Sequence, residues 1–200
     1  ALAEVVARLD PGRRFMPTSP YGPEFYDDPA YFDAWPHWDV HGPWRPDKGL
    51  AAWEEFWEAD DSLLRSEVGC PGASPLALVE EYCAPDAFVQ PGGEIPAFRR
   101  QFDSWWWMEW ATFEQELGRA PVDKAEFIAW SQARQAEALS VAARACKKRF
   151  PRCGGIILWM GHDCFPCSSN TSIIDFLGDP KPAVAALAKV FREGTTLESM

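Results

Sequence analysis

The chain has 200 residues, of which 47% are apolar and 24% charged, and this length suffices to bury the core of one domain. No apolar run is long enough to cross a bilayer, and the net charge of −11 lacks the Lys and Arg excess that binds nucleic-acid phosphates. We therefore expect neither a membrane nor a nucleic acid as a partner.

Short apolar runs alternate with amphipathic stretches along the chain, which is typical of βα units on a parallel sheet. The first residue, Ala1, already lies within a helical pattern, so we interpret the chain as beginning partway through a longer protein. The first part predicts a helix at 1–9, strands at 14–18 and 38–41, a helix at 49–58 and a strand at 63–68.

The second part begins with a helix predicted at 75–83, with Ser74 as its N-cap. A long helix is predicted at 122–150, where Asp123 and Glu126 form a capping box. The remaining elements are one or two helices at 98–117, which include the tryptophans at 105–107, a strand at 156–160 and a helix at 182–192.

A leading helix followed by four strand–helix repeats predicts an α/β fold. A (β/α)₈ barrel contains eight such units in about 250 residues, so this order predicts half of a TIM barrel. The strand at 156–160 is almost entirely apolar, and we expect it to be covered on both faces. A flavodoxin-like parallel sheet is the structural alternative, although no Gly-rich phosphate loop follows the first strand.

The six cysteines are too sparse for a disulfide scaffold, and the compartment stays open. Cys164 and Cys167 form a Cys-x-x-Cys motif, but a zinc site would need a second such pair or well-spaced His ligands. We expect thiols that are unpaired or locally paired, and neither a metal ion nor a cofactor.

The predicted strands end in polar or aromatic residues, which in a barrel meet at one mouth where catalysis takes place. The residues at these ends are Thr18 and Ser19, Asp39 and His41, Ser66 and Glu67, and Trp159 followed by His162 and Asp163. The eleven tryptophans add aromatic faces on which a sugar ring could stack, although core packing is the more common role of Trp.

Several motifs in fixed order resemble glycoside hydrolase family 2, and the β-mannosidase-like branch matches best. They are the segments 14–20 and 39–44, the Ser-Glu-x-Gly of 66–69, Trp159, and the stretch 172–183, which looks like the end of those barrels. The resemblance spans most of the chain. It implies that residues 1–200 form the C-terminal half of the catalytic barrel, roughly strands 5 to 8 of the eight.

The resemblance implies roles for the matching residues. Glu67 would be the nucleophile that forms a glycosyl-enzyme intermediate, which water then hydrolyses with retention. Trp159 would be the platform under the terminal sugar, and core packing is its alternative role. His41, which could equally be structural, and Asp39 would bind sugar hydroxyls. Asp163 and Trp44 complete the predicted substrate-binding set.

The chain departs from the family in two places. The general acid/base of the family is the Glu of an Asn-Glu pair, and this sequence contains no such pair, so we expect it upstream of Ala1. The spacing of Asp39, Glu94 and Asp163 supports none of them as a substitute. After Trp159, Phe165 stands where many relatives carry Trp before a Pro, which leaves the substrate preference open.

These observations predict an exo-acting retaining β-glycoside hydrolase that needs the upstream half of the same barrel. Three alternatives stay open. The chain could be a non-catalytic carbohydrate-binding barrel, a β-galactosidase-like or β-glucuronidase-like enzyme, or an inactive structural fragment. Such a fragment would expose open sheet edges, which tend to pair with other chains.

Overall fold

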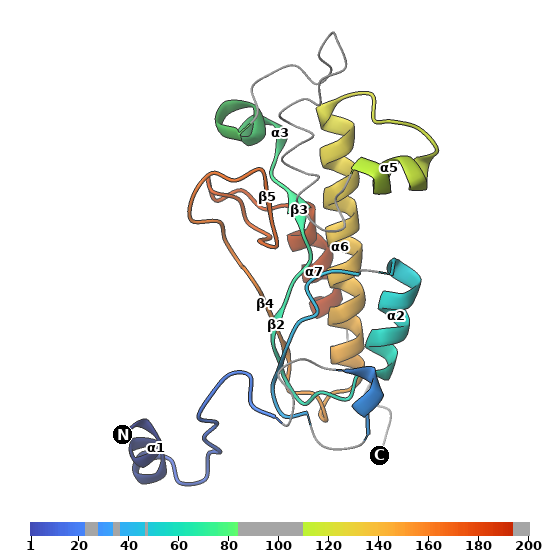
Figure 1. Cartoon of the computed structure of the whole chain (residues 1–200). Helices are drawn as coiled ribbons and strands as arrows, with labels where there is room; N and C mark the ends of the chain where they lie inside the picture. Colours follow the sequence, from blue (N-terminus) through green and yellow to red (C-terminus); the bar gives the residue numbers. More distant parts are fainter. Residues whose placement is uncertain (23–27, 34–36, 47, 84–109, 194–200) are drawn as a thin grey trace.

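The computed structural model describes residues 1–22, 28–33, 37–46, 48–83 and 110–193 (Figure 1). A three-stranded parallel sheet has the order β1-β2-β4, formed by Val40–His41, Arg65–Val68 and Ile156–Leu158. A small antiparallel sheet joins β3, Gly72–Ala73, to β5, Ser169–Asn170. The chain therefore has an α/β fold.

Each strand of the parallel sheet is followed in the chain by a helix. These helices are α2, Leu50–Ala59, α6, Lys124–Lys148, and α7, Pro182–Arg192. The long helix α6 lies between α2 and α7 and contacts both (Figure 1). The shorter elements are α1, Leu2–Leu9, the 3-10 turn Pro29–Tyr31, α3, Leu76–Leu78, the π-helical turn Val79–Cys83, and α5, Trp110–Leu117. Helix α1 buries none of its residues and stands apart in Figure 1.

The main hydrophobic core lies between the parallel sheet and the three helices. Trp53 and Trp57 of α2, Val68 of β2, Leu139 of α6 and Leu187 of α7 are all buried in it. Alanines along α6 let the neighbouring elements approach closely, and the Trp53 indole donates to the Ala138 carbonyl at 2.9 Å. This core holds the sheet and the helices together as one body.

A buried ionic cluster closes the end of the sheet where β2 begins. Asp60 and Arg65 are both fully buried, and the Arg65 guanidinium donates to the Asp60 carboxylate at 2.6 Å. Arg149, after α6, pairs with the other carboxylate oxygen. Arg65 also lies over the ring of Trp57, 4.9 Å from its centroid. Because a buried charge without its partner is costly, this cluster fixes how α2, β2 and α6 meet.

One amide of α6 ties the two loops at the opposite end of the sheet. Gln135 is fully buried, and its Nε2 donates to the Cys70 carbonyl at 2.8 Å and lies 3.1 Å from the Ser172 carbonyl. A Cβ on Gly72 would lie 2.4 Å from the Gln135 carboxamide oxygen, so a glycine at position 72 leaves room for the Gln135 amide. The loops after β2 and after β5 are thus held by one side chain.

The helices predicted at 1–9, 49–58, 122–150 and 182–192 are confirmed within two residues, and the strands predicted at 38–41, 63–68 and 156–160 are confirmed as shorter strands. The strand predicted at 14–18 is wrong. Residues 11–20 form exposed turns and bends, and the nearest pairing is an isolated antiparallel bridge between Tyr21 and Asp39. Pro17 and Pro20 lack the N–H that a strand ladder needs. The described residues therefore hold three strand–helix repeats rather than four.

Two smaller predictions are also wrong. The helix after β3 begins with Pro75 at the N-cap and receives no side-chain cap, because the Ser74 backbone pairs with the Ser168 carbonyl instead. Strand β4 is not covered on both faces, since Ile157 is 55% exposed. The helix predicted at 98–117 is confirmed for Trp110–Leu117, and the tryptophans at 105–107 lie outside the described residues.

The predicted capping box at the start of α6 is present in an extended form. Asp123 accepts from the Glu126 N–H at 2.8 Å, and Glu126 accepts from the Val122 N–H at 2.7 Å. Arg119 pairs with the same carboxylate. The Arg119 hydrogen bond and then the Val122 N–H lower the pKa of Glu126 from 4.5 to about 2.

This lowered pKa makes the stability of α6 dependent on pH. The stabilisation from Glu126 is present above about pH 4.5 and is lost as the pH falls towards about 2, because only the folded state favours the ionised carboxylate. We expect Glu126→Gln to lose less stability than the unmodified chain between pH 6 and pH 3. Urea unfolding at both pH values measures this, with Glu137→Gln, an exposed carboxyl of the same helix, as control. An identical pH response in the two variants would contradict it.

Replacing Gln135 tests whether its amide holds the two loops. We expect Gln135→Leu to lower the free energy of unfolding by about 1–3 kcal/mol, because it leaves buried carbonyls unpaired. Gln132→Leu is the matched control, since Gln132 is half-buried and donates to one carbonyl, that of Ala73, at 3.0 Å. Urea unfolding should show a clearly smaller loss for the control, and equal losses would argue against the special role of Gln135.

Candidate active site

The predicted nucleophile lies in the central strand of the parallel sheet. Glu67 belongs to β2, and its side chain is 22% exposed. Its Oε2 lies 3.4 Å from Nδ1 of His41, which is its neighbour in register on β1. Parallel strands end at the same edge of a sheet, and this is why two residues 26 positions apart in the sequence meet there. Glu67 is thus partly open to a ligand and sits against an imidazole.

A serine connects this pair to Asp39. The Ser19 hydroxyl oxygen lies 2.8 Å from Asp39 Oδ2, 3.0 Å from His41 Nε2 and 3.0 Å from the Ser66 hydroxyl oxygen. The backbones of Tyr21 and Asp39 pair in both directions, at 3.0 and 3.2 Å, and this fixes the loop that carries Ser19. The sequence singles out Ser19 only as a predicted strand end and as part of a motif, because its hydrogen-bond partners lie 20 to 47 residues away.

Trp159 follows β4, next to the strand that carries Glu67. Its N–H donates to the Val68 carbonyl at 2.8 Å, and the Met160 N–H donates to the Thr171 hydroxyl at 3.1 Å. The Trp159 side chain stays 46% exposed, although it is bound to two structured segments through its backbone. A large aromatic face open to solvent is a surface on which a sugar ring can stack.

Trp44 lies just beyond the end of β1 and packs over Gly42. A Cβ on Gly42, whose φ is +74°, would lie 3.0 Å from the Trp44 ring. The Gly42 N–H donates to the Glu67 carbonyl at 2.8 Å. Gly42 thus contacts both the Trp44 ring and the Glu67 backbone, and Trp44 is half-buried.

Asp163 lies in the loop after Trp159 and is buried. It accepts from the Asn170 side chain at 2.9 Å, while its N–H donates to the Ile174 carbonyl at 3.1 Å. Lys181, also buried, donates to the Gly72 carbonyl at 3.1 Å. Burial lowers the pKa of Lys181, and the negative charge of Asp163 opposes that shift. Ser19 thus links Asp39 to His41, which contacts Glu67. Asp163 is instead buried in the loop after Trp159, where it accepts from Asn170.

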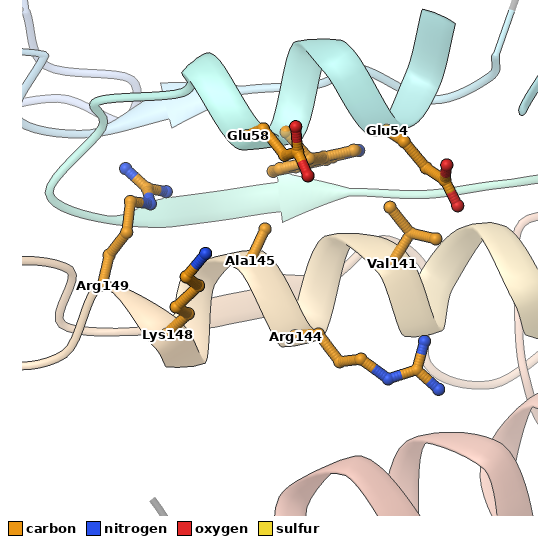
Figure 2. Close-up of a pocket in the computed structure, with 8 residues that line it drawn as sticks. Glu54, Glu58, Val141, Arg144, Ala145, Lys148 and Arg149 are labelled. Carbon is orange, nitrogen blue, oxygen red and sulfur yellow. The ribbon is translucent and has the colours of Figure 1, made fainter. Parts of the chain in front are cut away.

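A cavity of about 670 Å³ lies elsewhere, between α2 and α6 (Figure 2). Its acidic wall consists of Glu54 and Glu58 on α2, and its basic wall of Arg144, Lys148 and Arg149 at the end of α6. None of the predicted site residues lines it. It belongs to the helical layer rather than to the strand ends, and we therefore do not assign it to catalysis.

The described residues contain no group of three or more His, Cys, Asp or Glu placed to hold a metal ion. No helix among them is long and apolar enough to cross a membrane.

Cys146 and Cys153 are buried and interact through their thiols, which lowers the pKa of Cys153 to about 6, whereas Cys164 is exposed.

Comparison with known proteins gives a consistent result, although no protein-family model matches the chain. The sequence is 28% identical over 199 residues to β-mannosidase B of Aspergillus flavus, covering 96% of the chain. It is also 28% identical over 197 residues to β-mannosidase B of Aspergillus niger, covering 94% of the chain. The fold matches the crystal structure of a β-D-mannosidase from Dictyoglomus thermophilum, with a TM-score of 0.68 and 22% identity over 96% of the chain.

The chain is homologous to one segment of the β-mannosidases. It spans 22% of the length of the curated β-mannosidases that it matches. The resemblance to the β-mannosidase-like branch, predicted from motif order, is thereby confirmed. At 22% identity the Dictyoglomus structure supports the α/β fold and carries no information on individual roles.

The glycine of the Ser-Glu-x-Gly motif lies where the loop after Glu67 touches the segment that follows β4. A Cβ on Gly69 would lie 2.6 Å from the Trp159 carbonyl oxygen and 3.0 Å from the Thr171 Cβ. The first of these neighbours is backbone and cannot swing away. Glycine is therefore required for the loop after Glu67 to pack against the loop that carries Trp159.

We expect Gly69→Ala to destabilise the chain by about 1–3 kcal/mol, because the added methyl group has no room. Gly161→Ala is the matched control, since nothing lies within 4 Å of a Cβ built there. Urea unfolding followed by Trp fluorescence measures the stability of both variants. The expectation fails if the two variants are equally stable.

Proposed function

We propose that the chain is part of a retaining, exo-acting β-glycoside hydrolase of glycoside hydrolase family 2, with Glu67 as its nucleophile. The observation that carries the proposal is the position of Glu67. Glu67 lies on the central parallel strand, and its partly exposed carboxylate contacts His41 of the neighbouring strand β1. Trp159 follows β4, the strand on the other side. The homology to β-mannosidases favours a β-mannoside as the substrate.

Glu67 has the properties that a glycosidase nucleophile needs. A carboxylate attacks the anomeric carbon in its ionised form and later leaves when water hydrolyses the glycosyl-enzyme intermediate, so that the configuration is retained. Arg65, two residues earlier, donates to the Asp60 carboxylate at 2.6 Å and to the Gly42 carbonyl at 2.8 Å. A strong Arg ion pair would hold the carboxylate and weaken its nucleophilicity, whereas the longer His41 contact leaves an oxygen available.

The other predicted site residues complete the proposed substrate site. Trp159 would provide an open aromatic face for the terminal sugar, His41 contacts Glu67, and Trp44 follows β1 and packs over Gly42. Asp39 and Asp163 are only 2% and 1% exposed. They would act on the sugar through the groups that they orient, which are Ser19 for Asp39 and Asn170 for Asp163.

The proposal requires a second carboxylate that this sequence does not identify. Retaining glycosidases place the general acid/base about 5–5.5 Å from the nucleophile. We propose that it comes from a preceding part of a longer protein, in which residues 1–200 provide roughly strands 5 to 8 of a (β/α)₈ barrel. Two observations support this arrangement: the chain spans 22% of its relatives, and Ile157 leaves one face of β4 open.

Glu67→Gln in the longer protein tests the proposal on aryl β-mannosides and aryl β-galactosides. We expect turnover to fall roughly a thousand-fold or more, because the amide cannot form the covalent intermediate. Glu54→Gln, which removes an exposed carboxyl of α2, is the matched control and should keep its turnover. Unchanged turnover in Glu67→Gln would overturn the nucleophile assignment. Sugar binding without turnover in the unmodified protein would favour a non-catalytic carbohydrate-binding barrel.

A further inference from the structure

Two buried cysteines lie together at the end of α6. Cys146 belongs to the last part of this helix, and Cys153 follows it by seven residues in the chain. Both belong to the main hydrophobic core, and they are 3% and 2% exposed. A buried thiol that only fills space behaves as a small apolar side chain and needs no partner, whereas these two thiols form a hydrogen bond with each other. The pair is therefore a dithiol whose chemistry goes beyond core packing.

The backbone between the two cysteines folds back onto the helix. The Arg149 N–H donates to the Cys146 carbonyl at 3.2 Å, and the Arg149 carbonyl accepts from the Cys153 N–H at 3.1 Å. The Gly154 N–H then donates to the Leu63 carbonyl at 2.7 Å, which holds the segment against the residues before β2. A disulfide requires that its two backbone positions approach closely. The two hydrogen bonds at Arg149 bring Cys153 back towards Cys146 in this way.

The two thiols differ in acidity. The hydrogen bond from the Cys146 thiol, helped by the charge of Arg149, outweighs burial and lowers the pKa of Cys153 to about 6. The same hydrogen bond, together with burial, raises the pKa of Cys146. Arg149 Nη2 lies 3.7 Å from Cys146 Sγ, and the protonated form of Cys153 donates to the Gly155 carbonyl at 3.6 Å. Near neutral pH, Cys153 is thus the thiolate that can attack an oxidant, and Cys146 keeps its proton.

A cavity ends close to this pair. Arg149 lines the cavity of about 670 Å³ between α2 and α6, beside Ala145 and Lys148 (Figure 2), and it also contacts the Cys146 sulfur. Hydrogen peroxide is hardly larger than water, so it can pass a single side chain that excludes a bulky oxidant. Arg149 therefore stands between the cavity and the two thiols.

We propose that Cys146 and Cys153 are a peroxide-sensitive pair that closes to a disulfide and thereby staples the end of α6 to the segment that leads into β4. This inference does not depend on the role of Glu67. It assigns a chemical modification to a part of the fold that the proposed glycosidase reaction does not use.

The reaction has two steps. The Cys153 thiolate attacks one oxygen of hydrogen peroxide, the O–O bond breaks, and a sulfenic acid and a hydroxide ion form. The Cys146 sulfur then attacks the Cys153 sulfur, and the departing hydroxyl takes the Cys146 proton and leaves as water. The hydroxide of the first step takes up a proton from solution. The two sulfurs together lose two electrons, and peroxide is reduced to two molecules of water.

Mass spectrometry of the 200-residue chain tests the pair directly. Replacing both cysteines of the Cys-x-x-Cys motif, by Cys164→Ser and Cys167→Ser, leaves the tryptic peptide that begins at Cys153 without another cysteine. The chain is treated with millimolar hydrogen peroxide, denatured, alkylated and digested with trypsin. We expect most of this peptide to be linked to the short peptide that carries Cys146. The proposal is overturned if both peptides are alkylated instead, at a peroxide dose that oxidises the exposed Cys164 of the unmodified chain.

Single variants identify the thiol that reacts first. Cys146→Ser keeps a hydrogen-bond donor beside Cys153 but offers no second thiol, so Cys153 should proceed to the sulfinic acid. In Cys153→Ser, Cys146 should stay reduced under the same treatment. Oxidation of Cys146 in Cys153→Ser, with Cys153 unreacted in Cys146→Ser, would contradict the proposed order. If either variant does not fold, the linked peptide from the chain that keeps both cysteines still decides the proposal.

Urea unfolding measures the staple. A disulfide restricts the unfolded chain, so we expect the oxidised chain to unfold at a urea concentration about 1 M higher than the reduced chain. Dithiothreitol should reverse this shift. The comparison uses the background with Cys164→Ser and Cys167→Ser, and the same treatment of Cys153→Ser in that background should give no shift. A linked peptide without any rise in the urea midpoint would show that the disulfide is not a staple.

Discussion

The arrangement of the candidate site depends on one buried amide, that of Gln135. From the middle of α6 it donates to the carbonyl of Cys70, three residues after Glu67, and lies within hydrogen-bond distance of the carbonyl of Ser172, in the segment that follows β5. Buried carbonyls are almost always paired, so neither loop can move away without leaving an unsatisfied acceptor. Helix α6 thus sets the spacing between the loop after Glu67 and the segment after β5. That segment includes Thr171, whose hydroxyl accepts from the N–H of Met160, next to Trp159.

The two ends of the parallel sheet carry opposite kinds of electrostatics. Where β2 begins, Arg65 and Arg149 pair with the Asp60 carboxylate in a largely buried cluster that serves packing. Where the strand ends, Glu67 meets a single imidazole at 3.4 Å and keeps part of its surface open. Both arginines therefore pair with Asp60, whereas the Glu67 carboxylate contacts a histidine. This separation agrees with the proposed barrel, since catalytic residues of a (β/α)₈ barrel lie at the carboxyl ends of its strands.

The homology to β-mannosidases and the local geometry support each other at different levels. Sequence similarity over nearly the whole chain shows homology to one segment of the β-mannosidases, but it does not assign roles to residues. The contacts among Ser19, Asp39, His41 and Glu67 describe the local geometry around the proposed nucleophile. The open face of β4 at Ile157 agrees with a chain that provides only part of a barrel.

Local patterns in the sequence sufficed for the helices, since the 3.6-residue periodicity and the cap at Asp123 act within a few residues. Motif order predicted Glu67 and Trp159 as site residues, and their roles stay predictions. What only the tertiary structure decided were the non-local contacts: the segment at 14–18 found no partner strand, and Ser19 became central through side chains 20 to 47 residues away. Such contacts leave no local pattern, because a strand or a hydrogen-bonded row exists only once its distant partner is in place.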